Sequence, residues 1–436
     1  MVKNMRHLAP DYIYTPSGLQ SAPLLSISDN GTILSITDRS SQSVPPADSL
    51  LALPNTLLLP GFVNAHSHIF QRALRGHTHR PLSSQDTFWS WRNAMYAAAQ
   101  QLSPDRLYET ALPAYREMLA AGYTTVGEFH YVHHQMDGKP YAHPNAMAEA
   151  VLSAGHDAGI RVVLLMSAYA QGGINQPLEE GQRRFGDASV DAYLARVDAL
   201  RVSGVPVGLA PHSVRAVPES WFRPIATYSR VHSLPLHVHT DEQRAEIEQC
   251  QAAYGCTPIE LLERYEALSP LTTVIHATHA TERELDLLKR YQCTVCVCPT
   301  TEGDLGDGIA PYKELVAASI PLAIGSDSNT RFDPFEELRW AEYSARMRYE
   351  QRRILLSDPL ASPGPFLLDM GTRQGARALG LQTGSIAPGM STDLVAIDLN
   401  HPSLQGWSPD DLLDTLFFGS SAAAVKQVLV QGSEIV

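Results

Sequence analysis

The stretch Pro60-Gly61-Phe62-Val63-Asn64-Ala65-His66-Ser67-His68 is an apolar run that ends in two histidines two positions apart. Side chains alternate along a β-strand, so His66 and His68 point to the same side and can reach one ion. Two histidines bonded to backbone carbonyls near a turn are the less favoured interpretation. Neutral imidazole suits zinc, iron or nickel, and the residue type alone does not choose among them. The stretch therefore predicts a strand that delivers two metal ligands.

Seven further apolar, β-branched runs follow along the chain, and segments rich in Ala, Leu, Glu and Arg separate most of them. The predicted strands are Leu58–His66, Tyr123–Phe129, Arg161–Ala168, Val205–Pro211, Pro235–His239, Thr272–Ala277, Thr294–Cys298 and Ile320–Ser326. Pro104–Ala121 and Pro334–Glu350 are examples of the predicted helices. Apolar strands that alternate with helices are typical of a parallel sheet covered on both faces. We therefore expect an α/β protein built on a closed (β/α)8, TIM-like barrel.

Both ends of the chain are β-rich. Leu24–Ser28 and Thr32–Ile36 flank Asp29-Asn30-Gly31, a hairpin signal because Asn and Gly tolerate positive φ. Near the other end, Asp393–Ile397 and Val425–Val430 have the character of strands. This pattern predicts a small β-sandwich-like domain built from residues 1–57 and 385–436, with the barrel over residues 58–384.

Polar groups end six of the eight predicted strands. These groups are His66 and His68, Glu128 and His130, His212, His239, His276, and Asp327. The carboxyl ends of the strands form the catalytic face of such a barrel. Six endings of this kind in register are hard to explain by chance, so we expect the site on that face.

The fifth and eighth strands carry the clearest candidates for acid–base chemistry. In His237-Val238-His239-Thr240-Asp241-Glu242-Gln243, Glu242 lies just beyond the strand end and can exchange protons with a metal-bound water and a leaving nitrogen. A solvent-exposed charge in the first turn of a helix is the alternative for Glu242. Asp327 can contact both a metal and its water. His276 can stabilise a charged intermediate.

As a whole, this set resembles the amidohydrolase superfamily, whose barrel strands supply His-x-His, later histidines and a final Asp. The pair His239 and Glu242 is similar to the branch with His-x-x-Glu on the fifth strand. That branch typically holds one metal and hydrolyses C–N bonds at amidine-like carbons, releasing ammonia. The resemblance implies one divalent ion, expected to be zinc, and it assigns the following roles: metal ligands His66, His68, His239 and Asp327; catalytic residues Glu242, His276 and Asp327.

Further stretches resemble the formimidoylglutamate deiminases, which convert N-formimino-L-glutamate and water to N-formyl-L-glutamate and ammonia in histidine breakdown. The stretches are residues 68–72 (HIFQR), 88–92 (FWSWR), 128–134 (EFHYVHH), 181–185 (GQRRF), 212–217 (HSVRAV), 304–308 (DLGDG) and 336–340 (EELRW). The resemblance implies a small-molecule substrate with a cationic formimino group and two carboxylates. The Thr240-Asp241 pair departs from the family's apolar-Ala pair, which leaves glutamate versus aspartate backbones open.

Two carboxylates need paired donors. Arg92 and Arg215 offer bidentate forks, and Gln71, Tyr131 and His212 can add directed hydrogen bonds. A surface ion pair is the ordinary alternative for each arginine. For Arg92, the neighbouring tryptophans equally fit a core helix whose arginine reaches outward.

Two other functions remain open at this point. A deaminase of an aromatic base or a guanidine-like compound would keep the chemistry, and an aromatic-lined pocket without two arginines would favour it. A non-catalytic barrel that binds metal or ligand is less favoured, because Glu242 and Asp327 accompany a full set of ligands.

The composition narrows the possible partners. The 33 Lys and Arg against 46 Asp and Glu give a formal charge of −13 over 436 residues, which argues against nucleic acid as a partner. It also means that local arginines have to capture an anionic substrate. No apolar run is long enough to cross a bilayer, and Met1–His7 lacks the apolar core of a signal peptide. We expect a cytoplasmic protein without membrane partners.

Two remaining features concern cysteines and assembly. Among five cysteines, Cys293, Cys296 and Cys298 cluster in a β-branched run, which favours a buried, reduced strand over a zinc site. The run Leu416-Phe417-Phe418 can serve a homodimer interface if it is exposed.

Overall fold

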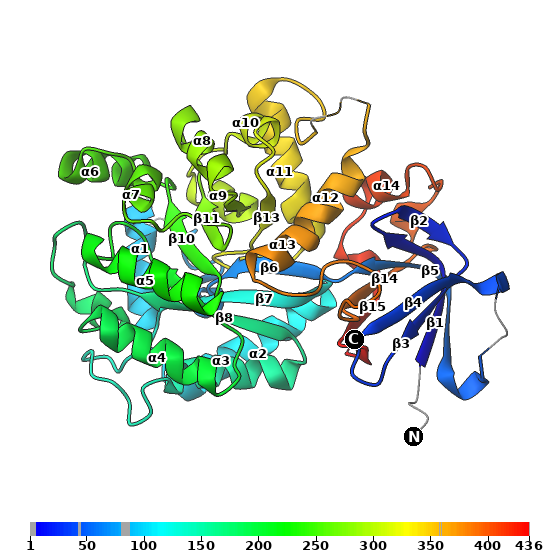
Figure 1. Ribbon diagram of the computed structural model, residues 1–436, viewed down its shortest axis with the longest axis horizontal. Coiled ribbons are helices and arrows are strands. Elements are labelled where there is room, and N and C mark those ends of the chain that lie inside the picture. The colour runs from blue at the N-terminus through cyan, green and yellow to red at the C-terminus, as the bar shows by residue number, and fades with distance from the viewer. Residues whose placement is uncertain (1–5, 42–44, 80–87, 357, 359, 436) are drawn as a thin grey trace.

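Eight parallel strands form one sheet of the protein, in the order β13-β12-β11-β10-β9-β8-β7-β6 (Figure 1). The computed structural model describes residues 6–41, 45–79, 88–356, 358 and 360–435, without the side chains of Phe88 and Trp89. The strands are β6 (Phe62–Ser67), β7 (Tyr123–His130), β8 (Arg161–Ala168), β9 (Val207–Pro211), β10 (Leu236–Thr240), β11 (Thr272–His276), β12 (Thr294–Val297) and β13 (Leu322–Ile324). Each neighbouring pair runs parallel.

The sheet closes on itself where β6 meets the end of β13. The backbone N–H of Asp327 donates to His66 O at 3.0 Å, and the N–H of His68 donates to Asp327 O at 3.0 Å. These bonds complete the barrel, so the predicted (β/α)8 fold is confirmed. They also bring the first and last strands' polar residues side by side at the carboxyl end.

Helices surround the barrel, as Figure 1 shows. Along the chain they are α1 (Phe88–Ala99), α2 (Pro104–Ala120), α3 (Ala146–Ala158), α4 (Val190–Val202), α5 (Glu219–His232), α6 (Arg244–Tyr254), α7 (Pro258–Arg264), α8 (Glu282–Arg290), α9 (Pro299–Leu305), α10 (Tyr312–Ala317), α11 (Pro334–Tyr349), α12 (Pro363–Gly371), α13 (Arg373–Ala378) and α14 (Leu412–Gly419). Ser103 caps α2 by accepting from the Arg106 N–H, and Pro104 follows at the first helical position. In the part of the chain that is described, no helix combines the length and apolar character that a membrane span requires.

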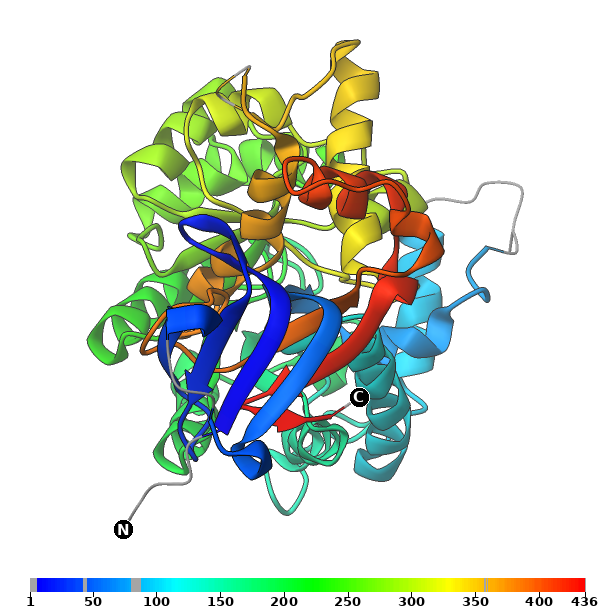
Figure 2. The same cartoon turned by 90° about the vertical axis from the view of Figure 1, so that its right-hand side faces the viewer.

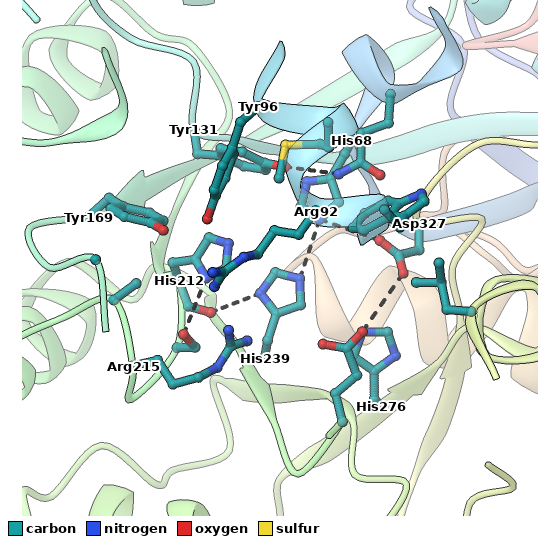
Figure 3. A pocket seen from close by; sticks show the side chains of 18 residues that line it. His68, Arg92, Tyr96, Tyr131, Tyr169, His212, Arg215, His239, His276 and Asp327 are labelled. Carbon is teal, nitrogen blue, oxygen red and sulfur yellow. Dashed lines mark hydrogen bonds and ion pairs between the residues drawn. The ribbon is translucent and has the colours of Figure 1, made fainter. Parts of the chain in front are cut away.

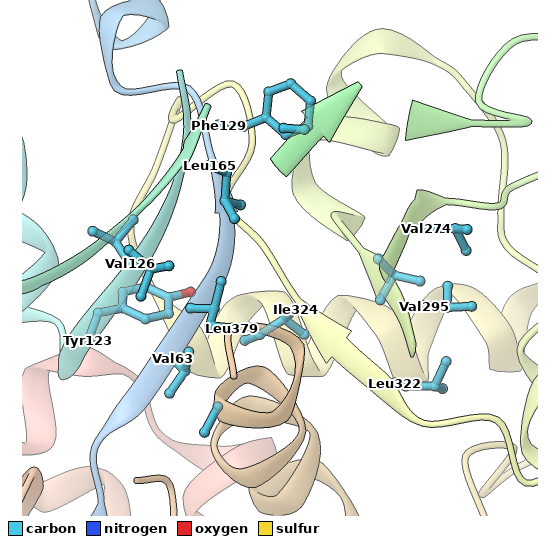
Figure 4. Packing of buried hydrophobic residues seen from close by; sticks show 14 of the residues in the cluster. Val63, Tyr123, Val126, Phe129, Leu165, Val274, Val295, Leu322, Ile324 and Leu379 are labelled. Carbon is cyan, nitrogen blue, oxygen red and sulfur yellow. The ribbon is translucent and has the colours of Figure 1, made fainter. Parts of the chain in front are cut away.

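Branched and aromatic side chains fill the barrel and its wall. Val63, Val126, Leu165, Val295 and Ile324 are buried there (Figure 4). Strands covered on both faces need apolar residues at successive positions rather than at alternate ones. That requirement explains why the sequence pattern reveals them so directly: seven of the eight predicted strands match the observed ones to within about two residues.

Both chain ends meet in a second sheet, the predicted small β domain, which lies beside the barrel (Figures 1 and 2). Its order is β16-β15-β14-β5-β1-β3-β4, with β2 on β1. The strands are β1 (Arg6–Thr15), β2 (Gly18–Ser21), β3 (Pro23–Ile27), β4 (Ile33–Asp38), β5 (Leu50–Pro60), β14 (Leu394–Asp398), β15 (Val425–Val430) and β16 (Ser433–Glu434). The predicted hairpin is β3 and β4, which pair antiparallel. The termini join where β14 pairs antiparallel with β5.

One predicted strand differs from the structure. The run Leu58–His66 is divided between β5 of the terminal sheet and β6 of the barrel, with Gly61 between them. Its residues are all buried, so hydrophobicity alone gave no sign of the division. A Cβ on Gly61 would collide with the Thr124 side chain, which explains the glycine at the point where the chain passes from one sheet to the other.

The apolar run considered as a dimer interface is part of the core. Leu416 and Phe417 on α14 are fully buried, and the Phe417 ring lies 5.8 Å from that of Phe335. These side chains attach the C-terminal segment to the barrel, so the run gives no support to a homodimer, which stays a prediction. All five cysteines are free and buried, as expected of a reduced strand.

Candidate active site

Four of the predicted side chains meet at the carboxyl end of the barrel. One ligand atom from each of His66, His68, His239 and Asp327 lies within 4.8 Å of the others. The Nε2 atoms of His66 and His239 are 3.1 Å apart, and those of His68 and His239 are 3.3 Å apart. Asp327 Oδ1 is 3.3 Å from His66 Nε2 and 3.4 Å from His68 Nε2.

Hydrogen bonds to backbone carbonyls fix the tautomers of two of these histidines. His68 Nδ1 donates to Phe129 O at 2.8 Å, and His239 Nδ1 donates to His212 O at 2.8 Å. Burial lowers the pKa of both rings, so each is neutral, with its lone pair on Nε2. Two lone pairs 3.3 Å apart repel each other unless a cation lies between them.

The donor set fits a divalent metal ion. Zn–N bonds of about 2.0–2.1 Å in a tetrahedral site place neighbouring ligand atoms about 3.3 Å apart, close to the separations among these four residues. The backbone acceptors behind His68 and His239 are also a usual feature of metal ligands. Three neutral imidazoles and one carboxylate can therefore hold a single ion here.

Three ionisable side chains lie beside the cluster: Glu242, His276 and Glu302. His276 Nε2 lies 3.9 Å from Glu242 Oε1 and 3.8 Å from Asp327 Oδ2. Burial raises the pKa of Glu242 to about 7. Burial alone would lower the pKa of His276, yet the carboxylates of Glu242, Glu302 and Asp327 raise it well above its usual value. A carboxyl that can exchange protons near neutrality thus lies beside a charged imidazole.

Other strand-end residues brace the site instead of lining it. Glu128 accepts from Ser67 Oγ at 2.9 Å and from the Ile69 N–H at 2.8 Å, which holds the segment that carries His66 and His68. His237, near the start of β10, is not part of the cluster, and its Nε2 donates to Ala378 O at 2.8 Å.

The predicted substrate-binding residues line one pocket together with His68, His239 and Asp327 of the cluster (Figure 3). They are Gln71 on the short helix η3 (Ile69–Leu74), Arg92 on α1, Tyr131 after β7, and His212 and Arg215 after β9. Gln71 donates to the Tyr131 hydroxyl at 2.8 Å. Arg215 Nε donates to Glu246 at 3.1 Å, which leaves the terminal NH2 groups of its guanidinium for other partners.

Arg92 faces the pocket, so the alternative in which it reaches outward from a core helix is wrong. Its Cζ lies 5.5 Å from the centre of the Tyr96 ring. Trp91 also lines the pocket, whereas the side chain of Trp89 lies outside the described residues.

Several side chains at the site were not predicted from the sequence. Tyr96 and Tyr169 line the pocket, and Glu302 Oε1 lies 3.3 Å from His276 Nδ1. Tyr169 and Glu302 follow β8 and β12, the two strands that end without His, Glu or Asp. A polar aromatic directly after β8 was the available signal for Tyr169. Nothing in the sequence placed Tyr96 of α1 at the site.

Comparison with known proteins places the chain in a family. The model for "Amidohydrolase family" matches residues 57–435. A formimidoylglutamate deiminase of Pseudomonas aeruginosa is 39% identical over 384 residues, covering 87% of this chain and 84% of that protein. An 8-oxoguanine deaminase of the same organism is 29% identical over 439 residues, covering 97% and 92%. The crystal structure of an amidohydrolase from Brucella melitensis superimposes with a TM-score of 0.88 at 32% identity, covering 98% of this chain and 94% of that one.

The chain therefore belongs to the amidohydrolase family and is a metal-dependent hydrolase that acts on C–N bonds. Within that class it is an amidohydrolase-type deaminase. Its relatives are named after different compounds, so membership of the family does not by itself identify the substrate.

Proposed function

We propose that this protein hydrolyses N-formimino-L-glutamate to N-formyl-L-glutamate and ammonia. The observation that carries the proposal is the presence of two arginines, Arg92 and Arg215, in the same pocket as the candidate metal cluster. The substrate is a dicarboxylate, and guanidinium groups bind carboxylates through paired hydrogen bonds. The 39% identity to a formimidoylglutamate deiminase supports the same assignment.

The ion would be held by His66, His68, His239 and Asp327, and we expect it to be zinc. When bound, it would supply a Lewis acid that makes a water acidic enough to ionise near neutral pH. The protein contributes fixed tautomers of His68 and His239, which aim their lone pairs at one point.

Glu242 is the proposed general base and acid. With a pKa of about 7, its carboxylate can accept a proton from the attacking water and later donate one to the departing nitrogen. The water oxygen bonds to the formimino carbon, the C–NH2 bond breaks, and ammonia leaves as the formyl carbonyl forms. His276, charged and within 4 Å of Glu242 and Asp327, would stabilise the negative charge that develops during attack.

Gln71, Tyr131 and His212 are proposed to orient the substrate between the cluster and the arginines. The Tyr131 ring lies 5.0 Å from His68 and 5.4 Å from His212, so these side chains occupy the layer next to the metal ligands. Gln71 Oε1 is buried without a protein partner, and it can accept a hydrogen bond from a substrate N–H group.

A deaminase of an aromatic base is the second candidate. Trp91, Tyr96, Tyr131 and Tyr169 line the pocket and could stack on a planar ring. Two cationic side chains among them favour the dicarboxylate over a neutral base.

Ammonia release tests the proposal. The purified protein loaded with zinc is offered N-formimino-L-glutamate, with 8-oxoguanine as the competing substrate and chelator-treated protein as the control. We expect fast, metal-dependent release from the formimino compound. A zinc-containing protein that releases ammonia from 8-oxoguanine and none from N-formimino-L-glutamate would make the substrate assignment wrong.

A further inference from the structure

A fully buried glutamine joins two tyrosines of the pocket wall. Gln182 lies on the short helix η4 (Glu180–Phe185), and its Nε2 is 2.9 Å from the Tyr96 hydroxyl and 3.0 Å from the Tyr169 hydroxyl. Tyr96 belongs to α1 and Tyr169 follows β8, so three separate segments converge at one point. None of the three residues has a part in the proposed chemistry.

Hydrogen-bond chemistry determines how the Gln182 amide is oriented. Its Oε1 accepts from the Glu179 N–H at 2.9 Å, so Nε2 is the end that faces the tyrosines. An amide nitrogen donates and does not accept, so both phenolic oxygens act as acceptors toward it. Each tyrosine therefore keeps its own hydroxyl hydrogen for another partner.

One of these hydrogens remains available to a partner outside the tyrosine pair. The two hydroxyls also interact with each other, and such a contact uses one hydrogen. The other has to be donated outside the pair. Burial raises the pKa of Tyr169 well above its usual value, so its hydroxyl keeps the proton that it donates.

The space that these hydroxyls face has the chemistry of an anion site. Figure 3 shows the hydroxyls of Tyr96 and Tyr169 turned toward the same part of the pocket as the guanidinium groups of Arg92 and Arg215. Two cationic forks and a neutral hydroxyl donor suit a carboxylate, which accepts several hydrogen bonds at once.

The His212 ring lies between the Tyr169 end of this corner and the metal ligand His239 (Figure 3). The centre of the His212 ring is 4.8 Å from that of His239 and 5.0 Å from that of Tyr169. In the substrate, the side-chain carboxylate is two bonds farther from the reacting nitrogen than the α-carboxylate. A corner set back by one aromatic ring therefore matches the more distant carboxylate.

We propose that Tyr96 and Tyr169, positioned by Gln182, complete with the arginines a subsite for the substrate's side-chain carboxylate and so determine specificity for it. The inference rests on the proposed function and deepens it. The tyrosines would contact the substrate, whereas Gln182 is a positioning residue that acts through them.

Paired substrates test the tyrosines. Tyr96→Phe, Tyr169→Phe and the double variant are assayed on N-formimino-L-glutamate and on N-formimino-L-norvaline, whose methyl group replaces the side-chain carboxylate. Loss of a hydrogen bond to a charged group should lower kcat/KM for the glutamate substrate by roughly 10- to 100-fold, mainly through KM. The change with norvaline should be much smaller. Tyr123→Phe is the control, because Tyr123 is a buried tyrosine at the opposite end of the barrel.

Gln182→Glu tests the positioning role. A carboxylate of the same shape can still accept from the Glu179 N–H, but its other oxygen accepts from the phenols and turns their hydrogens away from the pocket. We expect a loss on the glutamate substrate at least as large as that of the double tyrosine variant, with metal content close to wild type and a small change on the norvaline substrate.

The outcomes separate the inference from the proposed function. If the wild type hydrolyses N-formimino-L-glutamate but the tyrosine variants lose nothing, or lose equally on both substrates, the subsite is wrong and the function stands. If the zinc-loaded wild type releases no ammonia from N-formimino-L-glutamate, both are wrong.

Discussion

The two ends of the pocket are built in different ways. The metal end is defined by His66 on β6, His68 directly after β6, His239 on β10 and Asp327 three residues after β13. Backbone hydrogen bonds join Asp327 to both His66 and His68. The carboxylate end, defined by Tyr96, Tyr169, Arg92 and Arg215, lies on α1 and on the segments after β8 and β9. Rigid strands thus carry the groups that need the most exact geometry, and connecting segments carry the groups that select the substrate.

This difference predicts that changes at the metal end affect every substrate, whereas changes at the carboxylate end affect only substrates with carboxylates. The largest effect is expected for Glu242→Gln, which removes the proposed base without changing its size. Turnover should fall by about 10³-fold or more on any amidine, because proton transfer is lost. Zinc content, measured by elemental analysis, should stay at the wild-type level.

Glu248→Gln is the matched control for this variant, because Glu248 lies exposed on α6. Equal loss of zinc and of turnover in Glu242→Gln would assign Glu242 to metal binding and contradict its role as a base.

Arg92→Met should produce the next largest effect. Removal of one guanidinium that pairs with a carboxylate is expected to lower kcat/KM for N-formimino-L-glutamate by about 10²-fold, or roughly 3 kcal/mol. N-methylformamidine, which has no carboxylate, should be hydrolysed at a rate close to that of the wild type. Arg223→Met, at an exposed arginine, serves as the control. A similar loss on both compounds would mean that Arg92 supports the chemistry and not the choice of substrate.

Gly325→Ala tests the metal end through its backbone. A Cβ at this position would lie 2.7 Å from both Cβ and O of His66 and 3.1 Å from Cys298 Sγ, so the ligand strand has to shift. We expect a loss of about 1–3 kcal/mol of stability and weaker zinc retention on dialysis. At Gly303 of α9 an added Cβ meets nothing within 4 Å, so Gly303→Ala should behave as wild type. Full zinc retention by Gly325→Ala would show that the metal end tolerates displacement of its strand.

The smallest effect on activity is expected at Glu337, a buried residue of the barrel wall whose pKa burial raises to about 8. Because this pKa lies above the unfolded value near 4.5, ionisation favours the unfolded chain, and stability is lost as pH rises from about 4.5 to 8. Glu337→Gln removes this penalty and can keep both bonds to Thr300. Its free energy of unfolding should match that of the wild type at pH 5 and exceed it by about 1–3 kcal/mol at pH 8. A gain of equal size at both pH values would contradict the assigned pKa.

The sequence predicted the metal end of the pocket better than the carboxylate end. The barrel strands and the convergence of the metal end were predictable, because apolar runs mark buried strands and the carboxyl ends of parallel strands share one face. The grouping of Tyr96, Tyr169 and Gln182 was not, because their approach depends on how α1 and η4 pack and leaves no periodic signal.

One wrong strand boundary and one question that the sequence left open have the same origin. The run Leu58–His66 was predicted as one strand, because hydrophobicity does not tell which of two sheets buries a residue. Leu416–Phe418 was considered as an interface, because an apolar run does not reveal whether its own chain covers it. In both cases the deciding contacts come from residues far away in the sequence.

In the proposed mechanism, one ion at the metal end carries the hydrolysis of a formimino dicarboxylate. It is tested most directly by titrating metal-free protein with zinc while following ammonia release from N-formimino-L-glutamate. We expect no release without metal and a linear rise that saturates at one ion per chain. Saturation at two ions, or release by the metal-free protein, would contradict it.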